Sequence, residues 1–212
     1  GEPVFIERGI PASGVLSEQE FEPRVYFGEQ SPEYSIVGAP DGTEPVELDY
    51  PRGTDGASET KYTYTGDGGP KIGDFFSQLV YALKFQSEQI LFSDYVNPDS
   101  QILYDRDPLT RVKKVAPYLE LDNDPYPSVV DGKIVWIVDA YTTLQDYPYA
   151  QRSSLDGLVE DSIDENTGRP LPRKEVSYIR NSVKATVDAY DGTVKLFQVD
   201  DQDPVLDAWM GV

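Results

Sequence analysis

The chain has 212 residues, with 18 lysines and arginines against 38 aspartates and glutamates, so its formal net charge is −20. It contains no histidine and no cysteine, which excludes disulfides, thiolate nucleophiles, Ser-His and Cys-His catalysis, and zinc sites built on those residues. The acidic balance argues against nucleic acid as a partner and against docking on anionic lipid, since both need clustered lysine and arginine. Carboxylate, tyrosine, lysine or serine chemistry and binding of hard cations remain possible.

Short strands and loops are predicted for the first third of the chain. Residues 22–29 and 34–37 are rich in aromatic and β-branched side chains, as strands are. Residues 38–60 hold many prolines and glycines and have the composition of a loop, and residues 61–65 could form another strand. No apolar run approaches the ~18 residues that a transmembrane helix needs, and the residues that follow Gly1 do not have the pattern of a signal peptide. We therefore expect the chain to be a piece of something longer.

Two helices are predicted next. A long one covers about residues 72–92, and a short one covers about residues 108–116, with Asp107 as the N-cap, Pro108 at the first helical position and Pro117 as the stop. The long helix rests on apolar residues at helical spacing: Ile72, Phe75, Phe76, Leu79, Val80, Leu83, Ile90 and Leu91.

Strands return in the C-terminal half. After a short strand at 118–121, residues 128–141 predict a hairpin around Asp131-Gly132, because both central residues of a type I′ turn need a positive φ. Its second arm is apolar on both faces, which favours a central strand covered on both sides. Residues 176–200 predict a second hairpin around Asp191-Gly192, and residues 142–177 a long polar loop. Strand parity places Asn181 on the inward face of that hairpin.

These elements predict an α+β fold. The antiparallel sheet of hairpins from the C-terminal half should pack against the long helix (72–92) and the short helix (108–116). Residues 1–212 should form a single domain or a fragment of a larger one.

Two segments could bind an anion. The run from Gly66 to Gly73 precedes the long helix, where free backbone N–H groups can bind phosphate, but it does not match a P-loop and also suits a tight turn. Arg106, Arg111, Lys113 and Lys114 form the basic concentration of the chain, and Arg111 and Lys114 lie three residues apart. They could hold a small anion, or they could simply balance neighbouring acids on a solvated helix face.

Two acidic loops could bind calcium, which tolerates irregular loops of oxygen ligands. Neither loop has EF-hand spacing, and Asx-turns would explain both of them. Carboxylate pairs could also serve glycoside hydrolysis, with Trp136 or tyrosines stacking on sugar rings, although the apolar strand around Trp136 favours a core position. No cofactor is predicted beyond this possible calcium, whose candidate ligands are Asp122, Asp124, Asp200, Asp201 and Asp203.

Longer blocks of sequence resemble the uncharacterised protein family 0182, large bacterial multi-pass membrane proteins. The resemblance covers nearly the whole chain. It is carried by PRVYFGE at 23–29, YSIV at 34–37, ELDYP at 47–51, GDGG at 66–69, RVKKVAPYLELDNDPYP at 111–127, DGKIVWIVDAYTT at 131–143, YPY at 147–149, YIRNSVKATVDAYDGTV at 178–194 and DDQDP at 200–204.

The resemblance implies a location and partners, but no activity and no site residues. It implies a central piece of the extracytoplasmic region of a cell-membrane protein at the bacterial cell surface. The partners would then be the missing transmembrane and other extracytoplasmic parts of the same chain, and the membrane would be reached only through the absent helices.

Three functional hypotheses stay open. The lack of a nucleophile–base set favours a non-catalytic domain that binds or organises something at the cell surface. The alternatives are a carboxylate-dependent enzyme acting on cell-envelope glycan and a calcium-stabilised structural domain. For the first hypothesis, the expected binding surface is the rim where the long polar loop meets the strand after it, with contacts from Tyr141, Thr142, Tyr147, Tyr149 and Arg180.

Overall fold

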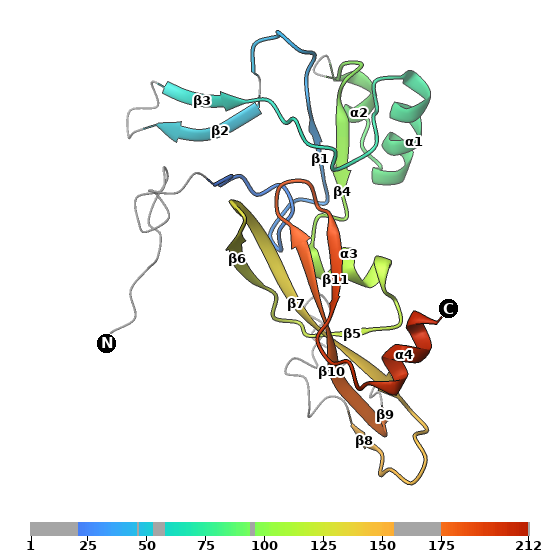
Figure 1. Cartoon of the computed structure of the whole chain (residues 1–212). Helices are drawn as coiled ribbons and strands as arrows, with labels where there is room; N and C mark the ends of the chain where they lie inside the picture. The colour runs from blue at the N-terminus through green and yellow to red at the C-terminus, as the bar shows by residue number, and fades with distance from the viewer. Residues whose placement is uncertain (1–20, 46, 53–57, 94–95, 155–174, 212) are drawn as a thin grey trace, which may run out of the picture.

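The computed structural model describes residues 21–45, 47–52, 58–93, 96–154 and 175–211. Figure 1 shows one group of elements at the top and a long antiparallel sheet below it. The upper group consists of β1 (Tyr34–Val37), β2 (Glu47–Arg52), β3 (Ser58–Tyr62), α1 (Phe75–Phe85), α2 (Gln89–Phe92) and β4 (Gln101–Tyr104). The lower group consists of α3 (Pro108–Val115), β5 (Glu120–Leu121), β6 (Tyr126–Val130), β7 (Lys133–Leu144), β8 (Ser153–Ser154), β9 (Glu175–Val176), β10 (Tyr178–Asp188), β11 (Val194–Gln198) and α4 (Pro204–Met210). Within the described ranges, no helix combines the length and the apolar character needed to cross a bilayer.

The long strand β7 is the centre of the main sheet. It pairs antiparallel with β10 along one edge, and with β6 and then β5 along the other. β11 completes the sheet on the far side of β10. The predicted α+β class with an antiparallel sheet of hairpins is confirmed.

One face of this sheet carries the core. Val138 and Ala140 of β7 and Ala185 and Val187 of β10 are buried there, and they pack against buried side chains of α3 and α4. The opposite face carries the ion pair between Lys184 and Asp139 across the two strands, next to Val135 and Ile137 of β7, which are half-buried. The predicted second arm, β7, is therefore the central strand as expected, but it is buried on one face and only partly covered on the other by the described residues.

Local capping and turn signals were accurate in this half of the chain. The Asp107 carboxylate accepts a hydrogen bond from the Thr110 N–H at the start of α3, as the N-cap prediction required. Asp131 and Gly132 both have positive φ, 51° and 75°, between β6 and β7. Only the second predicted hairpin turn differs, because Gly192 has a positive φ while the connection spans all the residues from Ala189 to Thr193.

The predicted helix 72–92 is two helices, and its packing partner also differs from the prediction. α1 ends at Phe85 because Gln86 adopts the left-handed conformation, with φ 51° and ψ 38°. Buried Ala82 of α1 and Ile90 of α2 pack with Ile102 of β4, so these helices form their core with the small β1–β4 sheet rather than with the large one.

A glycine at position 86 is expected to stabilise the protein. The left-handed conformation is unfavourable for a residue with a Cβ atom, and relief of that strain should exceed the added entropy of the unfolded chain, so Gln86→Gly should raise the free energy of unfolding by about 0.5–1 kcal/mol. The matched control is Gln78→Gly inside α1, which should lower it by about 1 kcal/mol. Urea unfolding of both variants checks this, and equal losses in both would contradict it.

Three other expectations need comment. Residues 22–29 form no strand, and only Glu22 makes an isolated bridge, to Lys133. β7 runs on to Leu144 inside the predicted loop 142–177, which also contains β8 and β9, while residues 155–174 lie outside the described ranges. Asn181 is exposed, because a bulge between Asn181 and Val183 reverses the parity that placed it inward.

Candidate functional site

Asp203 is the most densely bonded acid among the predicted candidates. It is fully buried at the N-cap of α4. Its Oδ2 accepts hydrogen bonds from the Thr142 hydroxyl at 2.5 Å and from the Ser182 hydroxyl. Its Oδ1 accepts from the Tyr178 hydroxyl at 2.6 Å and from the Val205 N–H at 2.9 Å. The structure thus brings together Thr142 and Asp203, which the sequence had placed in two different candidate sites, and it buries both.

The chemistry of this cluster is that of a structural anchor. Burial raises the pKa of Asp203, but the hydrogen bonds from Ser182, Thr142, Tyr178 and the Val205 N–H lower it more strongly, to about 2. Asp203 is therefore ionised at neutral pH, with its oxygens directed at four protein donors. Such a carboxylate has little left to offer a cation, whereas it joins α4 firmly to β7 and β10.

The β-bulge explains how the strand reaches this anchor. Because Ser182 is the extra residue, both Ser182 and Val183 are buried on the same side. The Ser182 hydroxyl then points to Asp203, and its carbonyl accepts hydrogen bonds from the N–H groups of Val199 and Asp200. No periodic pattern in the sequence signals this bulge, so strand parity could not find it.

The other predicted binding residues are only partly gathered. Tyr147 stacks on Tyr178, with ring centroids 4.9 Å apart. The Arg180 Nε lies 2.6 Å from an oxygen of Asp200, and its Nη1 donates to the Gln202 carbonyl. Tyr147 and Arg180 therefore contact residues next to the buried Asp203 or bonded to it.

Tyr141 and Tyr149 lie apart from that group. Tyr141 donates to the Asp122 carboxylate at 3.3 Å, whereas Tyr149 is fully exposed and has a φ of 61°. The expected rim is therefore not one continuous site in the described residues.

The acidic loops form turns of the kind that the sequence offered as the alternative to calcium. The Asp122 side chain accepts from the Asp124 N–H, and the Asp200 side chain accepts from the Gln202 N–H, which are both Asx-type contacts. Asp201 is exposed. Across the described ranges, no three acidic side chains come together in a group that could hold a metal ion.

The acids with shifted pKa values do not resemble catalytic acids. The carboxyl groups with a shifted pKa in the part of the chain that the structure describes are Asp74, Asp139, Asp188 and Asp203, and each of these shifts is downward. A general acid for glycoside hydrolysis needs a raised pKa. Trp136 is half-buried, and its Nε1 donates to the Phe27 carbonyl at 2.8 Å, so its polar edge is occupied by the protein itself.

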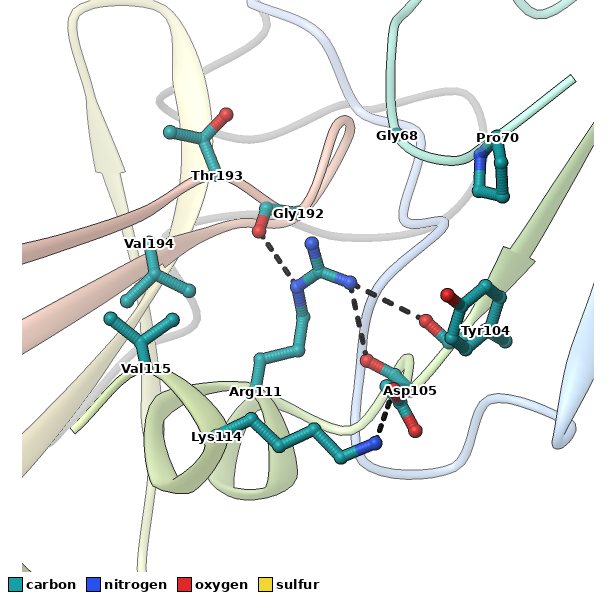
Figure 2. Close-up of a pocket in the computed structure, with 10 residues that line it drawn as sticks. All are labelled: Gly68, Pro70, Tyr104, Asp105, Arg111, Lys114, Val115, Gly192, Thr193 and Val194. Atoms are coloured by element: carbon teal, nitrogen blue, oxygen red, sulfur yellow. Dashed lines mark hydrogen bonds and ion pairs between the residues drawn. The ribbon is translucent and has the colours of Figure 1, made fainter. Parts of the chain in front are cut away.

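The glycine segment and the basic residues meet at a pocket of about 390 Å³. Figure 2 shows Gly68 and Pro70 on one side, and Arg111 and Lys114 of α3 on the other. The remaining lining comes from the end of β4, the end of α3 and the turn that leads into β11, namely Tyr104, Asp105, Val115, Gly192, Thr193 and Val194. The sequence had suggested both segments separately, but only the fold places them opposite each other.

Arg111 ties three segments together at this pocket. Its Nε donates to the Gly192 carbonyl at 2.7 Å, and its Nη1 lies 3.4 Å from the carbonyls of Tyr104 and Asp105. Its guanidinium also lies over the Phe27 ring, 4.5 Å from the centroid. Lys114 is paired with the Asp105 carboxylate at 2.5 Å.

The chemistry left to the pocket is modest. In Figure 2 the remaining guanidinium nitrogen of Arg111 has no bonded partner among the residues drawn and points toward the space between Gly68 and Thr193. That nitrogen could donate to one small acceptor group. Most of the basic charge of the pocket already serves the protein's own structure.

A tyrosine cluster around Glu47 was not found from the sequence. The Glu47 carboxylate accepts from the N–H groups of Gly38 and Tyr64 and from the Tyr26 hydroxyl. Burial, followed by the negative charge of Glu47, holds the pKa of Tyr26 well above its usual range. The excess of tyrosine, 15 residues, was the only available signal, and it does not specify position.

Comparison with known proteins identifies the family. The model of the uncharacterised protein family UPF0182 matches residues 1–212. A UPF0182 protein of Clavibacter michiganensis subsp. michiganensis is 60% identical over 212 residues, which are 100% of this chain and 21% of that protein. A UPF0182 protein of Rhodococcus opacus is 61% identical, over 100% of this chain and 21% of that protein. A UPF0182 protein of Rhodococcus jostii is 65% identical, over 90% of this chain and 19% of that protein.

No solved structure matches the chain. The chain spans about a fifth of the length of these relatives, 21% for the first two, and their names state no activity. The family-model match over the whole length and the identities of 60% and more show that the chain belongs to the uncharacterised protein family UPF0182.

Proposed function

We propose that this chain is a non-catalytic extracytoplasmic domain that binds or organises other parts of a longer membrane protein. The observation that supports this proposal most is the ionisation of the carboxyl groups. The shifted carboxyl groups in the described ranges are held ionised, and the most strongly held of them, Asp203, serves as an internal anchor. Proton transfer at neutral pH needs the opposite arrangement.

The length of the relatives supports assembly with other parts of a longer protein, and the net charge supports a location in water. Relatives of which this chain covers 21% contain much further sequence with which it could assemble. A net charge of −20 suits a surface facing water and disfavours contact with anionic lipid headgroups. The resemblance to multi-pass membrane proteins supports the extracytoplasmic location.

The location is tested by thiol labelling in intact cells. The chain has no cysteine, and Lys195 in β11 is exposed, so Lys195→Cys in the full-length protein introduces one reporter in this domain. A membrane-impermeant maleimide should label it in intact cells, with the modified peptide identified by mass spectrometry. Labelling only after permeabilisation would contradict the proposed location.

The absence of catalysis needs a separate measurement. The purified domain, incubated with cell-envelope glycan, is expected to release no new reducing ends. Release that disappears in an Asp139→Asn variant would support the enzyme hypothesis instead.

A further inference from the structure

α1 is apolar on nearly every side. Among its eleven residues only Ser77, Gln78 and Lys84 are polar. The side toward the small sheet carries Tyr81, Ala82 and Phe85, which pack in the core around Ile90 and Ile102. A surface helix normally has polar side chains on the opposite side, and a helix that is apolar all round is normally buried.

The opposite side of α1 is nevertheless exposed. Phe75, Phe76 and Leu83 have exposed fractions of 72%, 73% and 71%, and Val80 is exposed at 45%. α2, which packs against α1, adds Phe92 at 79%. We call these five residues the outer face of α1–α2. In Figure 1 the two helices lie at the edge of the upper group, beside β4 and away from the large sheet.

The eight-residue helix α3 shows a more usual division between a buried side and a polar side. α3 buries Val112 against the sheet and turns Thr110, Lys113 and Lys114 outward. Among the described helices, α3 exposes one large apolar side chain, Val115, and α4 exposes two, Trp209 and Met210, so the five of the outer face of α1–α2 form the larger group. Large apolar patches of this kind mark interaction sites.

We propose that the outer face of α1–α2 docks against an uncharged, apolar surface contributed by another part of the same polypeptide, beyond these 212 residues. This inference rests on the proposed role as an organising domain. Its first support is length, because the chain covers only 21% of relatives that are 60% and 61% identical to it.

Area and charge favour this occupant over a second copy of the chain. A stable interface between separate proteins needs about 800 Å² and roughly 20–30 residues on each side, far more than five side chains. A contact within one polypeptide needs less, because linkage raises the effective concentration to the order of millimolar. Two copies would also each carry a net charge of −20.

A lipid surface is also less suitable. Lys84 is the one basic residue within α1, and its Nζ lies 3.6 Å from the ring centroid of Tyr104, on the small sheet. The outer face therefore lacks the basic residues that draw an apolar helix to anionic headgroups.

Thiol accessibility tests the contact directly. In the 212-residue chain, Leu83→Cys and Lys195→Cys should both react readily with maleimide, because both positions are exposed. In the full-length protein, labelling of Leu83→Cys should slow by about tenfold or more, whereas Lys195→Cys should change by no more than about twofold. Equal rates at Leu83→Cys in both contexts, or equal slowing at both positions, would overturn the proposal.

A charge at the same position provides an independent readout. Leu83→Asp should leave the melting temperature of the 212-residue chain within about 2 °C, since the side chain is exposed there, but it should speed proteolysis of the full-length protein by about tenfold. Ala82→Asp, on the buried side of the same helix, should destabilise both. No change in the full-length protein would overturn the proposal.

Two further outcomes would assign the face to another occupant. Dimerisation of the 212-residue chain in sedimentation experiments, or its flotation with phosphatidylcholine vesicles, would overturn the proposal if Leu83→Asp abolished either. Loss of this contact would leave the location test at Lys195 unaffected, so the two proposals can fail separately.

Discussion

Replacing Asp203 by alanine is expected to lower the free energy of unfolding by about 3–5 kcal/mol. Asp203 is fully buried and accepts hydrogen bonds from three hydroxyl groups and one backbone N–H. Alanine would leave these donors without their acceptor inside the protein and would remove the N-cap of α4. Urea unfolding monitored by circular dichroism measures the loss.

Asp201→Ala is the matched control for this experiment. Asp201 lies two residues earlier in the same loop and is exposed, so its replacement should change the stability by no more than about 0.5 kcal/mol. A similar loss in both variants would mean that the loop, rather than the buried carboxylate, carries the effect.

The pH dependence of Asp203→Asn separates the charge from the packing. The folded-state pKa of Asp203 is about 2, below the ordinary value of about 3.9 for an aspartate in an unfolded chain. Its contribution to stability is therefore fully present above about pH 4 and is lost as the pH falls toward about 2. The wild-type chain should lose stability across that range more steeply than Asp203→Asn. Parallel curves would contradict the lowered pKa.

Elements fixed by neighbouring residues were predictable from the sequence. α3 needs only Asp107, Pro108 and a following apolar periodicity, and the turn between β6 and β7 needs only Asp131-Gly132. The break at Gln86 could not be foreseen, because a left-handed glutamine carries no local signal. The packing of α1 on β1–β4 depends on contacts between distant residues, which apolar periodicity does not specify.

The candidate sites show the same division. The sequence singled out Thr142, Arg180 and Asp203 as polar residues near strand ends, but it could not tell an exposed rim from a buried anchor. Part of that difference is one bulge, at Ser182, which turns an extra hydroxyl toward Asp203. The sequence also showed the glycine segment 66–73 and the basic residues of α3 as two separate features. Their meeting at one pocket depends on how β4 leads into α3.

Gly69→Ala is expected to cost about 3 kcal/mol or more, for a reason that lies entirely in packing. The segment after Gly69 runs beside β4, where the Ile102 N–H donates to the Pro70 carbonyl at 3.0 Å and the Ile72 N–H donates to the Ser100 carbonyl at 2.9 Å. A methyl group at Gly69 would overlap the Ile102 carbonyl oxygen, which belongs to the backbone of β4 and cannot turn away as a side chain could.

Gly211→Ala separates this steric effect from a general preference for glycine. Gly69 lies outside the left-handed region, so its backbone conformation does not itself require glycine. Gly211 has a φ of −86°, and a methyl group there would meet its nearest neighbours at 3.6 Å. Its replacement should change the stability by no more than about 0.5 kcal/mol. In Gly69→Ala, hydrogen exchange at the Ile102 and Ile72 amides should accelerate along with the global loss, because the two bonds beside β4 would open first. A loss below about 1 kcal/mol with unchanged exchange at these amides would show that the segment can move away from β4 at little cost.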